Sequence, residues 1–132
     1  FERSDAFPGL KKAYPFDFKK LEEMDINLRY KAFEEGKINA VDVFTTDAQI
    51  KNLDLKVLRD DKNYFPNYDA GIVIREGILE KYPEIEKLLL KFKGTISTEK
   101  MQELNYEVEI QQKSPAEVAK NFLKTLNQKN GK

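Results

Sequence analysis

The pattern of apolar residues changes near residue 75, and this change constrains the fold more than any other feature of the sequence. Before it, short apolar runs such as 38–44 and 70–74 alternate with polar loops and one helical stretch, as strands do in a mixed fold. After it, apolar residues recur every three or four positions, as on one face of a helix. The order strand, helix, strand predicts an α/β fold with a short, mostly parallel sheet, flanking helices and a helical carboxyl-terminal part.

Strands and helix ends can be placed within this pattern. We predict strands at 17–24, 38–44, 53–57 and 70–74. A helix that begins at Asp25 should end at Gly36, because glycine readily adopts the left-handed conformation that closes many helices. A second helix should end at Gly94, and Ser97 is a favourable N-cap for the next one. The run SPAE at 114–117 is a capping box with proline at the first helical position, so it predicts the start of the last helix.

Composition excludes several classes of function. The 132 residues include 23 basic and 23 acidic side chains, so no net charge attracts nucleic acid or an anionic membrane. The chain has no Cys and no His, which removes disulfides, zinc-thiolate sites and catalysis by cysteine or histidine. No apolar run approaches the ~20 residues that span a bilayer. We therefore predict a protein that is not an enzyme and that has no catalytic residue, no metal, no cofactor and no nucleic-acid partner.

Two segments combine aromatic and polar side chains where ligands often bind. Residues 43–47 (VFTTD) place a ring, two hydroxyls and a carboxylate at the end of a predicted strand, which is where ligands lie in open α/β sheets. Residues 60–68 (DDKNYFPNY) place three aromatic residues around a proline in a predicted loop. The simpler interpretation is structural, with Phe44 in a core, 45–47 as a helix cap and the other rings packed beneath the loop.

Eight short blocks follow one another along nearly the whole chain in an order that identifies a family. They are residues 3–14 (RSDAFPGLKKAY), 28–33 (LRYKAF), 44–47 (FTTD), 57–62 (VLRDDK), 65–68 (FPNY), 72–75 (IVIR), 101–105 (MQELN) and 114–119 (SPAEVA). In this order they resemble the substrate-binding proteins of glycine betaine/carnitine/choline ABC transporters. The chain departs from the family at Ala6, where glycine is usual, and at Phe44, where tyrosine is usual. Phenylalanine keeps the π face of the ring and loses its hydroxyl.

The resemblance implies a fold and an architecture. Members of the family have the two-lobed, type II periplasmic-binding-protein fold. Residues 1–74 would then be a segment of an α/β ligand-binding lobe, and 75–132 a helical segment that packs on the same lobe or on its partner. The chain would be a carboxyl-terminal fragment that lacks the amino-terminal lobe of the same protein.

The resemblance also implies a binding site. Members of the family hold a trimethylammonium group in a cage of aromatic rings and clamp the other end of the ligand with an arginine and hydroxyl groups. Phe44 and Tyr68 would be walls of the cage, and Arg3 would be the carboxylate clamp. Thr46 and Asp47 would be neighbours of the cage.

The expected function is the binding of a small osmolyte and its delivery to an ABC permease for osmoprotection, on the extracytoplasmic side of the membrane. The protein would be lipid-anchored there or fused to its permease. Glycine betaine, carnitine, choline and proline betaine all satisfy this description. Two rings at roughly 1 to 2 kcal/mol each fall short of the roughly 4 kcal/mol that millimolar affinity requires. The isolated chain should therefore bind such osmolytes weakly.

Three alternatives compete with this function. A binding protein for an amino acid or a polyamine would present carboxylates in place of aromatic faces. An enzyme would use Asp47 with Asp60 and Asp61 as acid and base, and one of these carboxylates would have a raised pKa. A plain interaction domain would present an exposed apolar groove.

Overall fold

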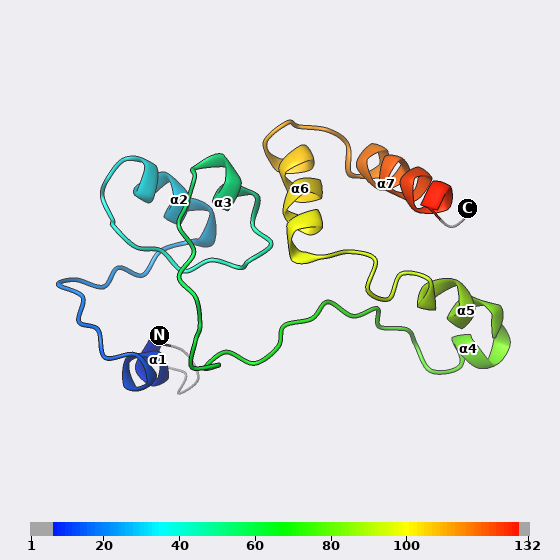
Figure 1. Ribbon diagram of the computed structural model, residues 1–132, viewed down its shortest axis with the longest axis horizontal. Coiled ribbons are helices and arrows are strands. Elements are labelled where there is room, and N and C mark those ends of the chain that lie inside the picture. The colour runs from blue at the N-terminus through cyan, green and yellow to red at the C-terminus, as the bar shows by residue number, and fades with distance from the viewer. Residues whose placement is uncertain (1–6, 130–132) are drawn as a thin grey trace. The chain divides into compact units, whose positions relative to one another are not determined.

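The computed structural model describes residues 7–129, and in this range the chain is built of helices joined by extended segments (Figure 1). The helices are α1 (Phe7–Ala13), α2 (Ile26–Glu34), α3 (Ala48–Asn52), α4 (Ile78–Lys81), α5 (Glu84–Leu90), α6 (Thr98–Glu109) and α7 (Pro115–Lys129). None of these helices is both long and apolar enough to cross a membrane.

The described residues form two compact units. The first takes in the described residues up to Asp42 together with Leu58–Asp69, and the second takes in Val43–Val57 and the described residues from Ala70 onward. Helices α1 and α2 belong to the first unit, and α3 to α7 belong to the second. The predicted division at residue 75 concerns the lobes of a larger protein and stays a prediction.

Helix α2 begins and ends where its sequence predicts. The side chain of Asp25 accepts a hydrogen bond from the backbone N–H of Asn27 at 2.8 Å, which satisfies one of the free donors of the first turn. At the other end Gly36 has φ +69°. Its N–H bonds to the carbonyl of Phe33, and the next N–H bonds to the carbonyl of Ala32, which is the Schellman arrangement.

The helical carboxyl-terminal part also follows its capping signals. The Ser97 hydroxyl accepts a hydrogen bond from the backbone N–H of Lys100 at 3.2 Å, so Ser97 is the N-cap of α6. Helix α7 begins at Pro115. Gly94 follows α5 with φ +70°, although α5 itself ends four residues earlier, at Leu90, and a tight turn covers the interval.

The predicted strands are absent from residues 7–129, and the predicted sheet is therefore not confirmed in this part of the chain. The segments 17–24, 38–44 and 70–74 have no regular secondary structure apart from isolated bends. A strand exists only with a ladder partner, and no described segment provides one. The apolar pattern is left exposed as a result, with Val73 96% accessible.

The absence of a strand at 53–57 has a different cause. Leu53 ends α3 and Asp54 takes the left-handed conformation, with φ +49°. The N–H of Leu55 then bonds to the carbonyl of Ile50 at 2.9 Å, so the first half of this segment closes a helix. Leu53 and Leu55 alternate with polar residues because they flank a cap, and the pattern of a half-buried strand arises by coincidence.

The core of the second unit lies where α6 packs against α3 and α7. Ala48 is fully buried, and Ile50 and Val118 are nearly so. Ala48 and Ile50 lie on α3, immediately after the segment that the sequence singled out as a candidate site. This packing anchors that segment to the longer helices.

Candidate functional site

Residues 44–47, which we call the FTTD turn, form a hydrogen-bonded reverse turn at the start of α3. The N–H of Asp47 donates to the carbonyl of Phe44 at 2.9 Å. In the opposite direction, the N–H of Phe44 donates to the Asp47 carboxylate at 3.1 Å. Asp47 occupies the N-cap position of α3 but makes no side-chain capping bond to that helix. Its carboxylate closes the turn instead.

Two amide side chains of α6 donate hydrogen bonds to the carbonyl groups of the two middle residues of the same turn. The Asn105 amide nitrogen Nδ2 donates to the carbonyl of Thr46 at 2.9 Å, and the Gln102 nitrogen Nε2 donates to the carbonyl of Thr45. Lys51, one turn into α3, lies 5.4 Å from the ring centroid of Tyr106 on α6 and forms a cation–π contact. The FTTD turn is therefore fixed both internally and by α6.

The side chains of the FTTD turn differ in exposure. Phe44 is 57% accessible, which leaves much of its ring free to meet a ligand. Thr46 and Asp47 are half-buried. Phe44 is therefore not a core residue of the described part of the chain, because a core phenylalanine would be almost inaccessible there.

Residues 60–68, the aromatic loop, are organised by the carboxylate of Asp60. It accepts hydrogen bonds from the backbone N–H groups of Tyr64 at 3.0 Å and Phe65 at 2.9 Å, and from the hydroxyl of Tyr14. The bond from Tyr14, followed by those from the two backbone amides, holds the pKa of Asp60 below its usual value. The enzyme alternative required a raised pKa on such a carboxylate, and Asp60 has the opposite shift.

Tyr14 joins the end of α1 to this loop. Its hydroxyl also accepts a hydrogen bond from the N–H of Lys62 at 2.8 Å. The Lys62 ammonium lies 5.0 Å from the Tyr14 ring centroid and donates to the carbonyl of Ala13. Partial burial, and then the bond to Asp60, raise the pKa of Tyr14 to about 12. The phenol is thus a neutral donor throughout the physiological range.

The aromatic side chains of the loop have two kinds of environment. Tyr64 and Phe65 meet edge to face, with ring centroids 5.0 Å apart at 80°. Tyr68, at the end of the loop, is 71% accessible. The interpretation that the rings pack beneath the loop therefore fits Tyr64, which is half-buried, better than Tyr68, which is exposed.

The structure groups the predicted site residues in part. Phe44, Thr46 and Asp47 lie together on the FTTD turn of the second unit, whereas Tyr68 belongs to the first unit. Arg3 lies outside the described residues. The ligand-binding roles of all five stay predictions.

Other residues of the site were not predicted. Gln102 and Asn105 fall in the block MQELN and Tyr14 in the first block, so the resemblance marked their positions without giving them a role. Contacts between residues so far apart in the chain have no local sequence signal. Among the described residues no group of three or more acidic side chains is placed to hold a metal ion.

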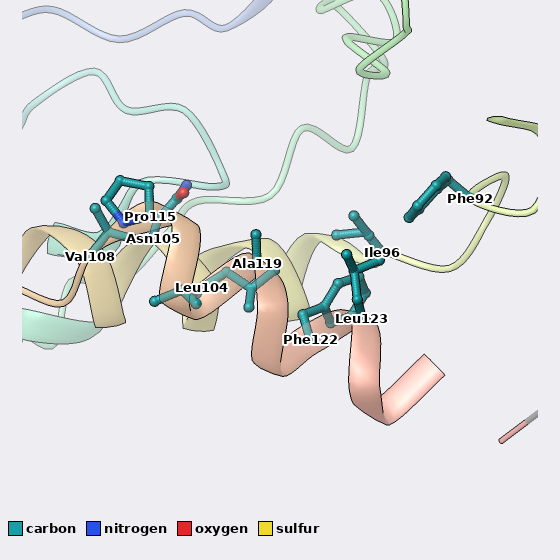
Figure 2. Close-up of a pocket in the computed structure, with 10 residues that line it drawn as sticks. Phe92, Ile96, Leu104, Asn105, Val108, Pro115, Ala119, Phe122 and Leu123 are labelled. Carbon is teal, nitrogen blue, oxygen red and sulfur yellow. The ribbon is translucent and has the colours of Figure 1, made fainter. Parts of the chain in front are cut away.

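A groove of about 340 Å³ runs between α6 and α7 (Figure 2). It is lined by Phe92, Ile96, Leu104, Asn105, Val108, Pro115, Val118, Ala119, Phe122 and Leu123. Nine of these ten side chains are apolar, which is the feature expected of an interaction domain. Geometry alone therefore leaves both a binding site and an apolar surface to be explained.

Aromatic faces can recognise quaternary ammonium ligands, and comparison with known proteins gives the family. The chain belongs to the family of substrate binding domains of the ABC-type glycine betaine transport system, whose model matches residues 1–125. This family consists of binding domains and not of enzymes, which confirms the prediction that the chain is not an enzyme. The resemblance to osmolyte-binding proteins is confirmed as well.

Several characterised proteins are similar to the chain. It is 67% identical over 126 residues to the ergothioneine transport permease/ergothioneine binding protein of Helicobacter pylori. The match includes 96% of this chain and 23% of that protein. It is 41% identical over 128 residues to the carnitine transport binding protein of Listeria monocytogenes. The match includes 97% of this chain and 42% of that protein. The chain thus spans less than half of each of these relatives.

A solved structure has the same fold over the same region. It is the crystal structure of a glycine betaine/carnitine/choline ABC transporter, with a TM-score of 0.82 and 43% sequence identity. The match includes 94% of this chain and 46% of the transporter chain. The chain therefore shares its fold with the corresponding part of that transporter structure.

Proposed function

We propose that the protein containing this chain binds a betaine, a solute with a trimethylammonium group and a carboxylate, and delivers it to an ABC importer. Among betaines we propose ergothioneine first, because the relative that shares 67% identity is named for ergothioneine, whereas the one named for carnitine shares 41%. Ergothioneine carries the same trimethylammonium and carboxylate groups as carnitine and glycine betaine, together with a thioimidazole ring.

The observation that carries this proposal is the exposure of Phe44 on a turn that four hydrogen bonds hold in place. A trimethylammonium group has no N–H to donate, so proteins recognise it through the negative faces of aromatic rings. A ring serves this purpose only when its face is accessible and its backbone is fixed. Tyr68 also has an accessible ring, three residues after Phe65, whose backbone N–H bonds to Asp60.

The remaining roles follow from the chemistry of the ligand. Arg3 would hold the carboxylate, because a guanidinium can bind both of its oxygens at once. Thr46 and Asp47 would line the cage beside Phe44. The chain would form part of a two-lobed, type II periplasmic-binding fold, and further walls of the cage would come from the other lobe.

The proposed setting is that of the family. The binding protein would act outside the cytoplasm and transfer its solute to a permease, either as a separate anchored subunit or within one polypeptide. The relative from Helicobacter pylori is named as both a permease and a binding protein, which supports the second arrangement.

Calorimetric titration of the full-length protein tests the proposal. Ergothioneine, carnitine, glycine betaine and choline are compared with spermidine and with a mixture of amino acids, which represent the alternative ligand class. We expect ergothioneine to bind most tightly. Phe44→Ala and Tyr68→Ala should each weaken binding about 5- to 30-fold, because one desolvated ring contributes roughly 1 to 2 kcal/mol.

Tyr82→Ala is the matched control, since Tyr82 is an exposed aromatic residue outside both candidate segments. It should leave the affinity unchanged. Tight binding of spermidine or an amino acid with no binding of any betaine would replace the proposed function with the alternative one.

A further inference from the structure

Gln102 and Asn105 donate hydrogen bonds to successive carbonyl groups of the FTTD turn. We infer that these two residues are positioning residues for the ligand site, and that they set the affinity for a betaine by fixing the backbone that carries Phe44. This inference rests on the proposed function of Phe44 as a wall of the cage.

The spacing of the two amides matches the spacing of the two carbonyls. Residues 102 and 105 are three positions apart on α6, so their side chains leave the same face of the helix. That face meets Thr45 and Thr46, whose carbonyls point out of the turn. The two bonds inside the turn, between Phe44 and Asp47, use other groups. All four bonds can therefore exist together.

Helix α6 is a rigid support for this contact. Ser97 caps its first turn, and α6 packs against both α3 and α7. Figure 2 shows Asn105 beside Val108 and Pro115, at one end of the groove between α6 and α7. Asn105 thus has apolar neighbours on α6 and α7 and a polar partner on the turn.

The effect on a ligand follows from conformational freedom. Without the two amides the carbonyls of Thr45 and Thr46 would bond to water, and only the two internal bonds would hold the turn. The ring of Phe44 would then sample more positions, and binding a ligand would require it to be ordered again. The result is weaker binding without the loss of any atom that touches the ligand.

The test uses variants that change the donors and little else. Asn105→Asp and Gln102→Glu keep the shape of each side chain and replace the donating amide with a carboxylate that cannot donate. Gln102→Lys restores a donor of similar reach. Glu103→Gln is the control, because Glu103 lies on the same helix and pairs with Lys100. Hydrogen exchange of the backbone over 43–48 and titration with ergothioneine, carnitine and glycine betaine are measured for each full-length variant.

We expect Asn105→Asp and Gln102→Glu to speed exchange in 43–48 and to weaken betaine binding by about threefold to tenfold each. Gln102→Lys should recover most of the loss, and Glu103→Gln should match the native protein. Because Gln102 makes its bond at an exposed position, its variants report on the inference even if substitution of Asn105 prevents folding.

A double-mutant cycle with Phe44→Ala separates positioning from general stability. If the amides act mainly through Phe44, Gln102→Glu should have a much smaller effect on affinity once the ring is removed. An equal loss in both backgrounds, or native exchange in 43–48, would overturn the inference. Native affinity in Phe44→Ala alone would instead refute the proposed role of Phe44, and the inference about ligand affinity would fall with it.

Discussion

The hydroxyl of Tyr14 donates a hydrogen bond to the carboxylate of Asp60, which lies 46 residues further along the chain. The same carboxylate accepts the backbone N–H groups of Tyr64 and Phe65, so one side chain connects the end of α1 to the aromatic loop. The shape of the loop that ends at Tyr68 therefore depends on a residue outside it.

Removal of the Tyr14 hydroxyl should loosen the aromatic loop. Tyr14→Phe keeps the ring and its contact with the Lys62 ammonium and removes the hydroxyl, which donates to Asp60 and accepts from the N–H of Lys62. We expect backbone hydrogen exchange at Tyr64 and Phe65 to become roughly threefold to tenfold faster, because one of the three bonds that fix Asp60 is lost. Tyr82→Phe is the control. Unchanged exchange would show that the two backbone amides suffice to fix Asp60.

Acid should weaken the same loop. The folded pKa of Asp60 is lowered from its usual value of 3.8, first by Tyr14 and then by the backbone of the loop. A lowered folded pKa stabilises the native state above the unfolded pKa, and this contribution is lost as the pH falls through the folded pKa. The advantage of the native protein over Asp60→Asn in thermal denaturation should therefore be full above about pH 4 and shrink below it. In a Tyr14→Phe background, where the folded pKa of Asp60 lies closer to its usual value, this contribution should be smaller and its loss should be complete at a higher pH.

The Tyr14 hydroxyl should lose its proton at a higher pH than an exposed tyrosine does. Its pKa is raised to about 12 by partial burial and then by Asp60, whereas an exposed tyrosine titrates near 10. A raised pKa means that the stabilising contribution is full below the unfolded pKa and disappears as the pH rises from about 10 to 12. Absorbance at alkaline pH, taken as the difference between the native protein and Tyr14→Phe, should show one group near 12. A difference curve centred near 10 would contradict the assignment.

Local signals in the sequence located most of the predicted helix ends, although α5 ends at Leu90, four residues before the predicted Gly94. Gly36, Ser97 and Pro115 each act through groups within five residues of themselves, so the sequence around each contains all the information that its role requires. The strands could not be placed in the same way, because a strand is stabilised by a partner that can lie anywhere in the protein. The apolar segment 70–74 has the composition of a strand and no partner among the described residues.

The candidate site was predictable to a similar extent. Composition drew attention to residues 43–47 and 60–68, and both contain an accessible aromatic ring on hydrogen-bonded backbone. The sequence did not predict which distant side chains hold these segments in place. Tyr14 and Asn105 lie 46 and 59 residues from their partners, and neither the period of a helix nor that of a strand connects residues at such distances.

Two glycines offer a direct test of the cap on α2. An added Cβ meets no atom within 4 Å at either Gly36 or Gly71, so alanine fits at both positions without a steric clash. Gly36 has φ +69°, which L-residues with a side chain adopt at a cost of about 1 kcal/mol, whereas Gly71 has no such constraint.

Gly36→Ala should therefore lower the free energy of unfolding by about 1 kcal/mol. Gly71→Ala should leave it unchanged or raise it by about 0.4 to 1 kcal/mol, because alanine restricts the unfolded chain. Urea denaturation of both full-length variants measures the difference. Equal stability of the two would mean that α2 can end without the left-handed residue, and that the bonds from Gly36 and Lys37 to Phe33 and Ala32 are dispensable.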